Sequence, residues 1–387
     1  MHKMIVTKIE TFPIRLPYGE PIADARSTIT HRATVLVRIE TDSGVFGWGE
    51  AAAFGDVANE VACIIRTRLA SHVIGKVVSP RDARRVLTKK TAHFGQRGLV
   101  TSAISGLDIA LWDALARAAG LPLCQLLGGS PTPIKLYGGT GYYAGKKSTK
   151  SKDLELLERS LLAPQGDFRG AKIKIGRYGL PDDIARVRLA RQVLGPKAIL
   201  IADANNAYSF HEALKFARQV EAYDLHFLEE PIEFGQPRVS ADLRRASPVR
   251  IAGYELEMTY TGFLPYIQQR SVDVLQPDCI WSGGILECLE IATAAQRAGI
   301  AISPHNFASM VSTAANYHFL CAAGGDVLEV DGTSSPLLKI PLEVDARTIR
   351  DGQLVIAGKP GLGIVPDLDY VRVLSNRTSP TANKVAA

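Results

Sequence analysis

The sequence has few cysteines, and their spacing excludes a small protein held together by disulfides. The five cysteines of the 387-residue chain are widely scattered, and none forms a Cys-x-x-Cys pair. This pattern suits a reducing compartment and indicates no thiol chemistry. The chain also lacks an N-terminal apolar run of signal-peptide length and any run of about 20 apolar residues, the length that crosses a bilayer. We therefore expect a soluble cytoplasmic protein that has no membrane partner.

The sequence also has no basic block, although its formal net charge is +6. Lysine and arginine are spread along the chain without the interleaved aromatic residues of a nucleic-acid-binding face. We predict no nucleic-acid partner, whereas a small anionic substrate is compatible with the mild positive surplus. The composition, with 46% hydrophobic and 22% charged residues, is typical of a globular α/β protein with a large core.

The first segment of the chain, residues 1–128, is predicted to be an α+β domain. Alternating apolar residues predict strands at 4–14, 34–40 and 45–48. The polar stretch 18–32 between the first two strands has no strong period, so it predicts a mobile loop. Helical periodicity replaces the alternation after residue 57.

The clearest helix of this segment runs from Thr101 to Ala119. Gly120 predicts its end, and Thr101 or Ser102 can cap its start. Asp108 lies at the edge of the apolar stripe of this helix. Because a buried carboxylate needs a partner, we expect Asp108 to form a structural hydrogen bond rather than to act in catalysis.

From residue 129 to 345, short apolar runs alternate with helical stretches of about ten to fifteen residues. Eight such units predict a parallel barrel. An open doubly wound sheet is the alternative, but no Gly-x-Gly-x-x-Gly motif opens a helix after the first strand. The final segment, 346–387, shows a strand-turn-strand pattern around Asp351 and Gly352 and ends in a tail that we expect to fray. The predicted barrel strands are Ile134–Tyr137, Ala171–Ile175, Ile199–Ala202, His226–Leu228, Val249–Ala252, Val272–Gln276, Ile300–Ser303 and Val327–Val330.

Ionisable residues stand at the carboxyl end of nearly every predicted barrel strand, where barrels of this kind place their active sites. From Asp203 onward, successive members lie 23 to 27 residues apart, which is the length of one βα unit. These side chains should therefore converge on one pocket. They are Lys172 and Lys174 on the second strand, followed by Asp203, Glu229, Glu255, Asp278, His305 and Glu329.

Three successive members of this series, Asp203, Glu229 and Glu255, predict a metal site. They form an all-oxygen ligand set without Cys or His, the kind that Mg²⁺ or Mn²⁺ prefers over Zn²⁺. Without a cation, three carboxylates in one barrel mouth would repel one another strongly. A single carboxylate at a strand end is usually a loop salt bridge or a helix cap, but three at matched spacing are not explained in that way.

Lys172 and Lys174 are two residues apart on a strand, so both ammonium groups point to the same side. Two such neighbouring cations lower each other's pKa. A lysine with a lowered pKa can act as a base at neutral pH. The alternative is one inward lysine and one surface lysine beside a turn.

His305 and Asp278 end neighbouring strands and should lie side by side. The carboxylate would fix the tautomer of the imidazole and raise its basicity. His305 and Lys174 should then approach the pocket from opposite sides and place a base on each face of a carbon atom held between them. A structural histidine is the alternative for His305.

These residues resemble the mandelate racemase branch of the enolase superfamily. The resemblance covers residues 4 to 366, and the motifs occur in the family's order. Outside the barrel it includes Gly47-Trp48-Gly49-Glu50, the helix Ser105 to Asp113 and Pro360-Gly361-Leu362-Gly363. In the barrel the matching stretches are Ala171-Lys172-Ile173-Lys174, Asp203-Ala204-Asn205, Glu229-Glu230-Pro231, Ala252-Gly253-Tyr254-Glu255, Gln276-Pro277-Asp278, Pro304-His305 and Glu329.

The resemblance implies a (β/α)₇β barrel under an N-terminal α+β cap, with the C-terminal segment packed back on the cap. It implies Asp203, Glu229 and Glu255 as Mg²⁺ ligands, although Glu230 stands next to the second ligand. It also implies Lys174 and the His305–Asp278 pair as bases, Lys172 as a support for Lys174, and Glu329 as a hydrogen-bonding partner of a substrate carboxylate. Enolase-superfamily sites of this kind stabilise an enediolate on one or two Mg²⁺ ions. Tyr254 replaces a frequent glycine, and we expect it to narrow the pocket.

The predicted reaction begins with loss of the α-proton from a small hydroxycarboxylic acid. If a β-hydroxyl group then leaves, the enzyme is an acid-sugar dehydratase. If a proton returns on the opposite face, it is a racemase or epimerase, and if a ring opens, it is a cycloisomerase. The resemblance favours the dehydratase. A barrel metallohydrolase is disfavoured because the first strand lacks His-x-His, and a catalytically silent scaffold because no base or ligand is missing.

Specificity should depend on the cap segments 18–32, 51–57 and 94–97. We predict Arg26, His31 and Arg97 from these regions, together with Asn205 from the barrel, as substrate contacts. Surface solvation is the alternative for the first three. The family also predicts a homo-oligomer.

Overall fold

Eight parallel strands form a ring in the order β12-β4-β6-β7-β8-β9-β10-β11, as the sequence predicts. The computed structural model describes residues 3–95, 97–146, 148–162, 167–325 and 327–378. The ring closes beside β11, where Ser303 Oγ donates a hydrogen bond to Val327 O at 3.5 Å. The strands are β4 Ile134–Gly139, β6 Gly170–Lys174, β7 Ile199–Asp203, β8 Phe227–Glu229, β9 Ile251–Gly253, β10 Val274–Leu275, β11 Ala301–Ile302 and β12 Val327–Asp331.

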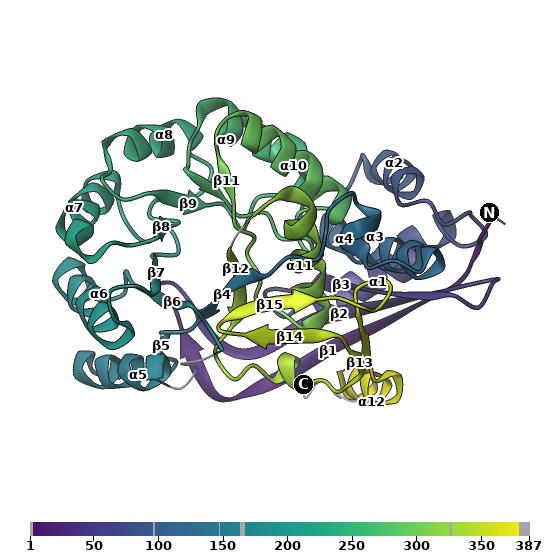
Figure 1. Ribbon diagram of the computed structural model, residues 1–387, viewed down its shortest axis with the longest axis horizontal. Helices are drawn as coiled ribbons and strands as arrows, with labels where there is room; N and C mark the ends of the chain where they lie inside the picture. The colour runs from purple at the N-terminus through teal and green to yellow at the C-terminus, as the bar shows by residue number, and fades with distance from the viewer. Residues whose placement is uncertain (1–2, 96, 147, 163–166, 326, 379–387) are drawn as a thin grey trace, which may run out of the picture.

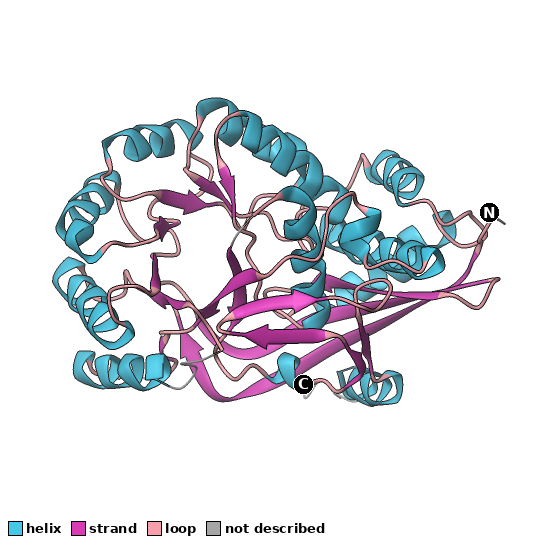
Figure 2. Cartoon of the chain, in the orientation of Figure 1, coloured by secondary structure: helices cyan, strands magenta, loops and turns pink. Residues whose placement is uncertain are grey.

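Helices surround this ring, as Figures 1 and 2 show. Each helix has an apolar face toward the strands; in α7, a capping box of Ser209 and Glu212 fixes the start, and Phe216 is fully buried. Burial of one such phenylalanine contributes roughly 1.5 to 3 kcal/mol. The helices are α5 Lys150–Leu162, α6 Leu180–Leu194, α7 Phe210–Val220, α8 Pro237–Ala246, α9 Thr259–Gln269, α10 Ile285–Arg297 and α11 Met310–Ala323.

The interior of the ring is layered. Its apolar layer holds the side chains of Tyr137, Ile201, Phe227, Ala252, Val274 and Val327. Lys172, Glu229 and Glu329 are also buried, at positions nearer the carboxyl ends of β6, β8 and β12. The barrel therefore has a packed apolar core, and its polar interior lies at the end where the strands finish.

The N-terminal cap contains an antiparallel sheet of β1 Val6–Ala23, β2 Thr28–Thr41 and β3 Phe46–Ala52. The predicted meander is confirmed, but the predicted loop at 18–32 is wrong. β1 and β2 continue through this stretch and remain paired up to Ala23 and Thr28. A tight turn then joins them, because the Asp24 carboxylate accepts hydrogen bonds from the backbone of Arg26 and Ser27. A short strand, β5 Tyr143–Ala144, pairs with the end of β1.

The helices of the cap are α1 Ala58–Ile64, α2 Pro80–Thr91, α3 Leu99–Ala119 and α4 Leu123–Leu126. α3 is the helix predicted from Thr101, and it ends at Gly120 in the left-handed conformation; its N-cap is Gly98 rather than Thr101 or Ser102. Glycine at position 47 is required by close packing, since a Cβ there would lie 2.1 Å from Ala110 O. Within the described residues, α3 alone is long and apolar enough to cross a membrane, but 89% of its most apolar stretch is buried.

Two buried aspartates of α3 fasten the cap to other parts of the chain. Asp108 accepts a hydrogen bond of 2.7 Å from Ile285 N at the start of α10, which confirms its predicted structural role. Burial raises the pKa of Asp108 to about 7. Asp113 accepts hydrogen bonds from Trp48 N at 2.8 Å and from Leu362 N at 2.7 Å. The carboxylate of Asp113 therefore connects the Gly47–Glu50 motif of the cap with the Pro360–Gly363 motif of the C-terminal segment, because it accepts a backbone hydrogen bond from each.

Glu50 makes a third such connection, from β3 to the start of α11. Its carboxylate accepts hydrogen bonds from Thr34 Oγ1 at 2.6 Å, Ser309 Oγ at 2.6 Å and Ser312 N at 2.8 Å. The side chain is fully buried, and burial raises its pKa. A carboxylate at a helix N-terminus is stabilised by the free backbone N–H groups there. Glu50 thus links the cap to the helix that follows the His305 strand.

The C-terminal segment contacts both the barrel and the cap. The strand-turn-strand pattern around Asp351 and Gly352 is confirmed, and β15 pairs with β4. Near the end of the segment, Gly361 O accepts a hydrogen bond of 2.8 Å from Leu123 N of α4. The elements of this segment are β13 Leu342–Asp345, β14 Arg347–Arg350, β15 Gln353–Ile356, β16 Ile364–Pro366 and α12 Leu368–Thr378. Most of the tail that we expected to fray lies outside the described residues.

Candidate active site

A cavity of about 250 Å³ lies between the carboxyl ends of the barrel strands and the cap. Barrel residues line one part of it, and residues of the β1–β2 hairpin and of the segment after β3 line the other. Six predicted site residues reach it from the barrel, namely Lys172, Lys174, Asn205, Glu255, His305 and Glu329. The convergence that the βα spacing predicts is therefore present.

Lys172 is the central charge of the site. Its Nζ atom lies 2.6 Å from Glu229 Oε1, 2.9 Å from Glu329 Oε1 and 3.5 Å from Asp203 Oδ2. Burial acts to lower the pKa of Lys172, but these three carboxylates outweigh burial and raise it well above its ordinary value. Lys172 is therefore a fixed cation that holds the ends of β6, β7, β8 and β12 together electrostatically.

Lys174 forms a close ion pair with Asp203, at 2.5 Å from Nζ to Oδ2. The predicted lowering of its pKa is wrong for this arrangement. Burial, the largest effect, and Lys172 both act to lower the pKa of Lys174, but Asp203, Tyr142 and Glu255 together raise it by more, so the net shift is upward. Burial acts to raise the pKa of Asp203, but the two lysines hold it at about 2. The neighbouring lysine still acts to lower the pKa, but the surrounding negative groups outweigh it.

The three predicted metal ligands lie in the same region but are not arranged as a ligand group. Glu229 Oε2 accepts a hydrogen bond of 2.9 Å from Gln276 Nε2, and Glu255 Oε2 lies 3.4 Å from His305 Nε2. Within the described chain, no three His, Cys, Asp or Glu side chains are close enough together to hold a metal ion. The lysines supply the positive charge that these carboxylates require, and the ligand assignment stays a prediction.

The donor chemistry of this region nevertheless fits a hard divalent cation. Glu230 is buried, and its pKa is raised well above the ordinary value by burial and by the carboxylates of Glu255 and Asp203. Among the described residues, Glu230 Oε1 has no hydrogen-bond partner, and neither do the buried side-chain oxygens of Asn205 and Asn206. Carboxylate and amide oxygens, crowded and incompletely satisfied, are the donors that Mg²⁺ takes. These residues provide such donors without any sulfur or imidazole ligand.

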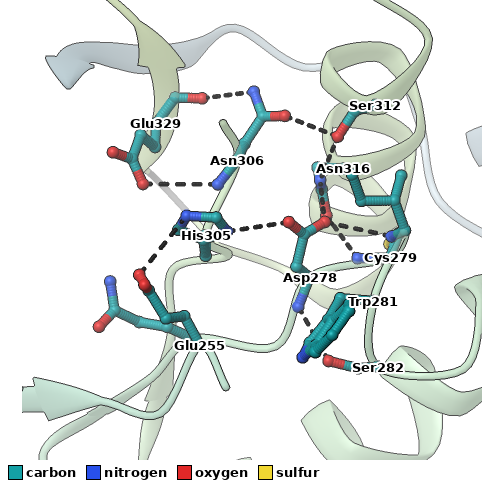
Figure 3. Close-up of polar contacts among 12 residues, drawn as sticks. Glu255, Asp278, Cys279, Trp281, Ser282, His305, Asn306, Ser312, Asn316 and Glu329 are labelled. Carbon is teal, nitrogen blue, oxygen red and sulfur yellow. Dashed lines mark hydrogen bonds and ion pairs between the residues drawn. The ribbon is translucent and has the colours of Figure 1, made fainter. Parts of the chain in front are cut away.

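His305 and Asp278 form the predicted pair, with 2.9 Å between Nδ1 and Oδ2 (Figure 3). Asp278 Oδ1 accepts further hydrogen bonds from Asn316 Nδ2 at 3.0 Å and Ile280 N at 3.1 Å. Burial acts to lower the pKa of His305, but Glu255 and Asp278 raise it to about 9. The Asp278 carboxylate is thus held on two sides. It binds Nδ1 of His305, so that Nε2 of the ring faces the cavity and Glu255.

Glu329 and the His–Asp pair share one network of amide and hydroxyl groups, drawn in Figure 3. Asn306 Nδ2 donates to Glu329 O at 2.8 Å, and Ser312 Oγ donates to Asn306 Oδ1 at 2.8 Å. Asn316 Nδ2 lies 3.4 Å from Ser312 Oγ and also donates to Asp278. Side chains of α11 therefore connect the His305–Asp278 pair with the Asn306–Glu329 contact.

The four predicted substrate contacts divide evenly. Asn205 and His31 line the cavity, whereas Arg26 and Arg97 do not. Arg26 is 53% exposed and lies 4.0 Å from Glu233, and Arg97 is 58% exposed and pairs with Glu257 in a separate surface hollow. The structure therefore does not bring these two exposed side chains to the cavity, and their assignment as substrate contacts stays a prediction.

Two aromatic wall residues of the cavity, Tyr142 and Phe307, escaped prediction from sequence. Phe54 and the buried Arg32 also line the cavity, and both lie in the cap segments 51–57 and 18–32 that were predicted to govern specificity. Phe307 stands two residues after His305, so the period of an extended segment could have indicated it. Tyr254 was expected to narrow the pocket, but it packs against Tyr266 and donates a hydrogen bond to Ser240 behind the strand.

Comparisons with known proteins match most of this chain. A model described as mandelate racemase/muconate lactonizing enzyme, N-terminal domain, matches residues 7–128, and one described as enolase C-terminal domain-like matches residues 154–370. An arabinonate dehydratase of Saccharolobus solfataricus is 34% identical over 85% of this chain and 87% of its own length. A D-galactarolactone cycloisomerase of Agrobacterium fabrum is 31% identical over 93% of this chain and 96% of its own length. A racemase of Streptomyces coelicolor, solved with bound magnesium, is 25% identical with a TM-score of 0.85 and covers 96% of this chain and 99% of its own.

Proposed function

This chain belongs to the mandelate racemase/muconate lactonizing enzyme family of the enolase superfamily, and we propose that it is an acid-sugar dehydratase. It would remove the α-proton of a sugar acid and expel the β-hydroxyl group to give a 2-keto-3-deoxy acid. The observation that carries this proposal is His305, which is held by Asp278 at 2.9 Å and lines the same cavity as Lys172, Lys174 and Glu329. The similarity to an arabinonate dehydratase supports it.

We assign Asp203, Glu229 and Glu255 to a Mg²⁺ ion, with Mn²⁺ as a possible substitute. When bound, the cation supplies positive charge to the substrate carboxylate. It also neutralises the charges of Asp203 and Glu255, which raise the pKa values of Lys174 and His305 in its absence. The crowded, incompletely satisfied oxygens around Glu230 support this assignment. It needs the Lys174–Asp203 contact to loosen, which would free the ammonium group.

The protein's own residues account for the proton transfers. The substrate carboxylate is held beside Lys172 and Glu329, with the α-carbon toward His305. His305 Nε2 takes the α-proton, and the electron pair of the broken C–H bond moves into the carboxylate to give an enediolate. The pair then returns to form the C2–C3 double bond as the C3–O bond breaks. The departing oxygen takes the proton from His305 and leaves as water, and the remaining enol becomes the 2-keto acid.

An epimerase is the second candidate. Lys174 at the end of β6 lines the same cavity as His305. A protonated amine on the opposite face could return a proton to C2 after His305 has taken the first one. One relative is named a D-galactarolactone cycloisomerase, so cycloisomerisation is a further alternative. A silent scaffold is disfavoured because every predicted acid–base residue lines the cavity or touches one that does.

Product analysis tests the proposal. The purified enzyme, supplied with Mg²⁺ in D₂O, would be incubated with a library of mono- and dicarboxylic sugar acids, and the products would be identified by NMR. We expect a 2-keto-3-deoxy acid as the efficient product. An epimer or a ring-opened isomer as the only efficient product would contradict dehydration. We further propose a cytoplasmic homo-oligomer; these two properties rest on the sequence and the family.

A further inference from the structure

A second polar cluster, distinct from the acid–base residues, lies in the cap part of the cavity wall. Its centre is Arg32 on β2, only 6% exposed. Arg32 Nε donates a hydrogen bond of 2.8 Å to Tyr18 Oη, and Nη2 lies 3.1 Å from Asp331 Oδ2. The Cζ atom lies 3.0 Å from the centre of the Phe307 ring. Arg32 is thus fixed from three directions.

One nitrogen of this guanidinium group is left for a ligand. Within the described residues, Arg32 Nη1 makes no hydrogen bond, and Arg32 is part of the cavity lining. Guanidinium N–H groups that face a largely enclosed site need an acceptor. A polar substrate atom in the cavity can supply that acceptor.

The positive charge of Arg32 is already balanced. Asp331 is 4% exposed and ends β12, two residues beyond Glu329. Thr333 fixes its carboxylate with a backbone hydrogen bond of 2.9 Å to Oδ1, and Thr333 Oγ1 also lies 2.8 Å from Tyr18 Oη. Arg32 therefore offers hydrogen-bond donors without an uncompensated charge.

The other charged groups of the cap add no positive charge to the cavity. Asp24 lines it from the hairpin turn, and Asp56 lines it while pairing with Arg15 at 2.7 Å. Among the described lining residues, the cap thus contributes two carboxylates, Asp24 and Asp56, and one guanidinium group, Arg32. The paired charges of Asp331 on β12 and of Arg15 lie just outside the lining. His31 is the remaining titratable residue among the described cap residues of the lining. A second carboxylate on the substrate would meet a surplus of negative charge there.

An aromatic wall connects this cluster with the acid–base residues. Tyr142 stacks on Phe307, with 5.6 Å between ring centres, and Lys174 Nζ lies 5.0 Å from the Tyr142 ring centre. The guanidinium group of Arg32 in turn lies over the ring of Phe307. A substrate whose carboxylate is held beside Lys172 would extend along this wall, and its far end would reach the cap.

We propose that Arg32 and Asp331 form the distal part of the substrate site and select monocarboxylic sugar acids. Arg32 Nη1 donates a hydrogen bond to a hydroxyl oxygen near the far end of the substrate. Asp331 neutralises the positive charge of Arg32, so no net positive charge is left there to bind a second substrate carboxylate. This inference rests on the proposed function, since it assumes a sugar acid whose C2 lies at His305.

The test compares a hexonic acid with the hexaric diacid of the same configuration, which differ only at C6. The readout is kcat/KM for exchange of the C2 proton in D₂O with Mg²⁺, which does not depend on the fate of the enediolate. We expect the monoacid to be favoured by at least about tenfold in the best-used configuration. A diacid used as well as or better than the monoacid would overturn the inference while leaving α-proton abstraction intact.

Two charge-changing variants should move this ratio in opposite directions. Asp331→Asn leaves Arg32 with an unbalanced positive charge, so the ratio of kcat/KM for the monoacid to that for the diacid should fall by about tenfold. Arg32→Gln leaves Asp331 with an unbalanced negative charge, so the same ratio should rise. Thr333→Val is the matched control, since it removes a hydroxyl group from the same cluster without changing its charge, and it should lower both efficiencies equally.

A ratio that stays constant in both charge variants, with the fold confirmed by circular dichroism, would show a merely structural role for Arg32 and Asp331. If every sugar acid retains its C2 proton, both the proposed function and this inference fail. If exchange occurs but no keto acid forms, only dehydration fails, and the substrate ratio still decides the inference.

Discussion

Replacement of Asp278 by asparagine should change the acid–base behaviour of His305. In the structure, Asp278 Oδ2 contacts His305 Nδ1 at 2.9 Å, and Oδ1 is held by Asn316 and Ile280. Asparagine has nearly the same shape, so the backbone contacts can persist. The substitution removes the negative charge and leaves a neutral amide beside the ring.

The magnitude follows from the raised pKa of His305, about 9 against an ordinary 6.5. The difference corresponds to about 3 kcal/mol in favour of the protonated ring. Glu255 and Asp278 supply this preference against burial, so loss of Asp278 should lower the pKa by at least about one unit. Loss of the fixed tautomer should also reduce the rate of proton abstraction by about 10² to 10⁴.

The sign of the stability effect is also fixed. Because the pKa of His305 is higher in the folded than in the unfolded protein, its contribution to stability is fully present below about pH 6.5. It is lost as the pH rises through about 9. Asp278→Asn should therefore destabilise the metal-free protein most at low pH and progressively less above neutrality.

An NMR titration of the His305 ring in chelator-treated protein measures the pKa, and C2 exchange with Mg²⁺ measures the rate. Asn316→Ala serves as the control, because it removes one hydrogen bond to Asp278 but keeps the charge, so its pKa change should be smaller. An unchanged His305 titration in the folded Asp278→Asn protein would refute the reasoning.

Three further predictions concern other parts of the site and the cap. His305→Asn should abolish C2 exchange from one substrate configuration and Lys174→Met from the other; equal loss from both configurations in either folded variant would argue against a two-sided site. Asp203→Asn should weaken Mg²⁺ binding measured by calorimetry and lower the pKa of Lys174 in the metal-free protein, whereas retained Mg²⁺ affinity would remove Asp203 from the ligand set. Glu50→Gln should lower the free energy of unfolding by about 1 to 3 kcal/mol, because buried donors on Ser309 and Ser312 lose a charged acceptor, and a thermal unfolding curve identical to that of the natural protein would contradict this role.

The barrel could be predicted from sequence because its signals are local and repeated. Each βα unit has a short apolar run, an ionisable residue and an amphipathic helix, and the matched spacing placed Asp203, His305 and their neighbours at one edge. The same logic identified Asp108 as structural, since a carboxylate on an apolar stripe needs a donor. All eight predicted barrel strands are present.

The cap part of the site was harder to predict because it depends on pairing across the chain. The stretch 18–32 appeared to be a loop, yet backbone pairing between β1 and β2 extends the sheet through it and directs Arg32 inward. Arg26 and Arg97 have equally suitable chemistry, and only the tertiary fold turns them away from the cavity. The predicted direction of the Lys174 pKa shift was wrong for a similar reason, since its closest charged partner, Asp203, belongs to another strand.

The most direct test of this account is the loss of the C2 proton. A sugar acid that the enzyme turns over should be incubated in D₂O with and without Mg²⁺, and deuterium exchange at C2 and product formation should be followed together. The account predicts that both require Mg²⁺ and that the double variant Lys174→Met/His305→Asn abolishes both while binding Mg²⁺ normally. Turnover without loss of the C2 proton, or turnover by the folded double variant, would contradict it.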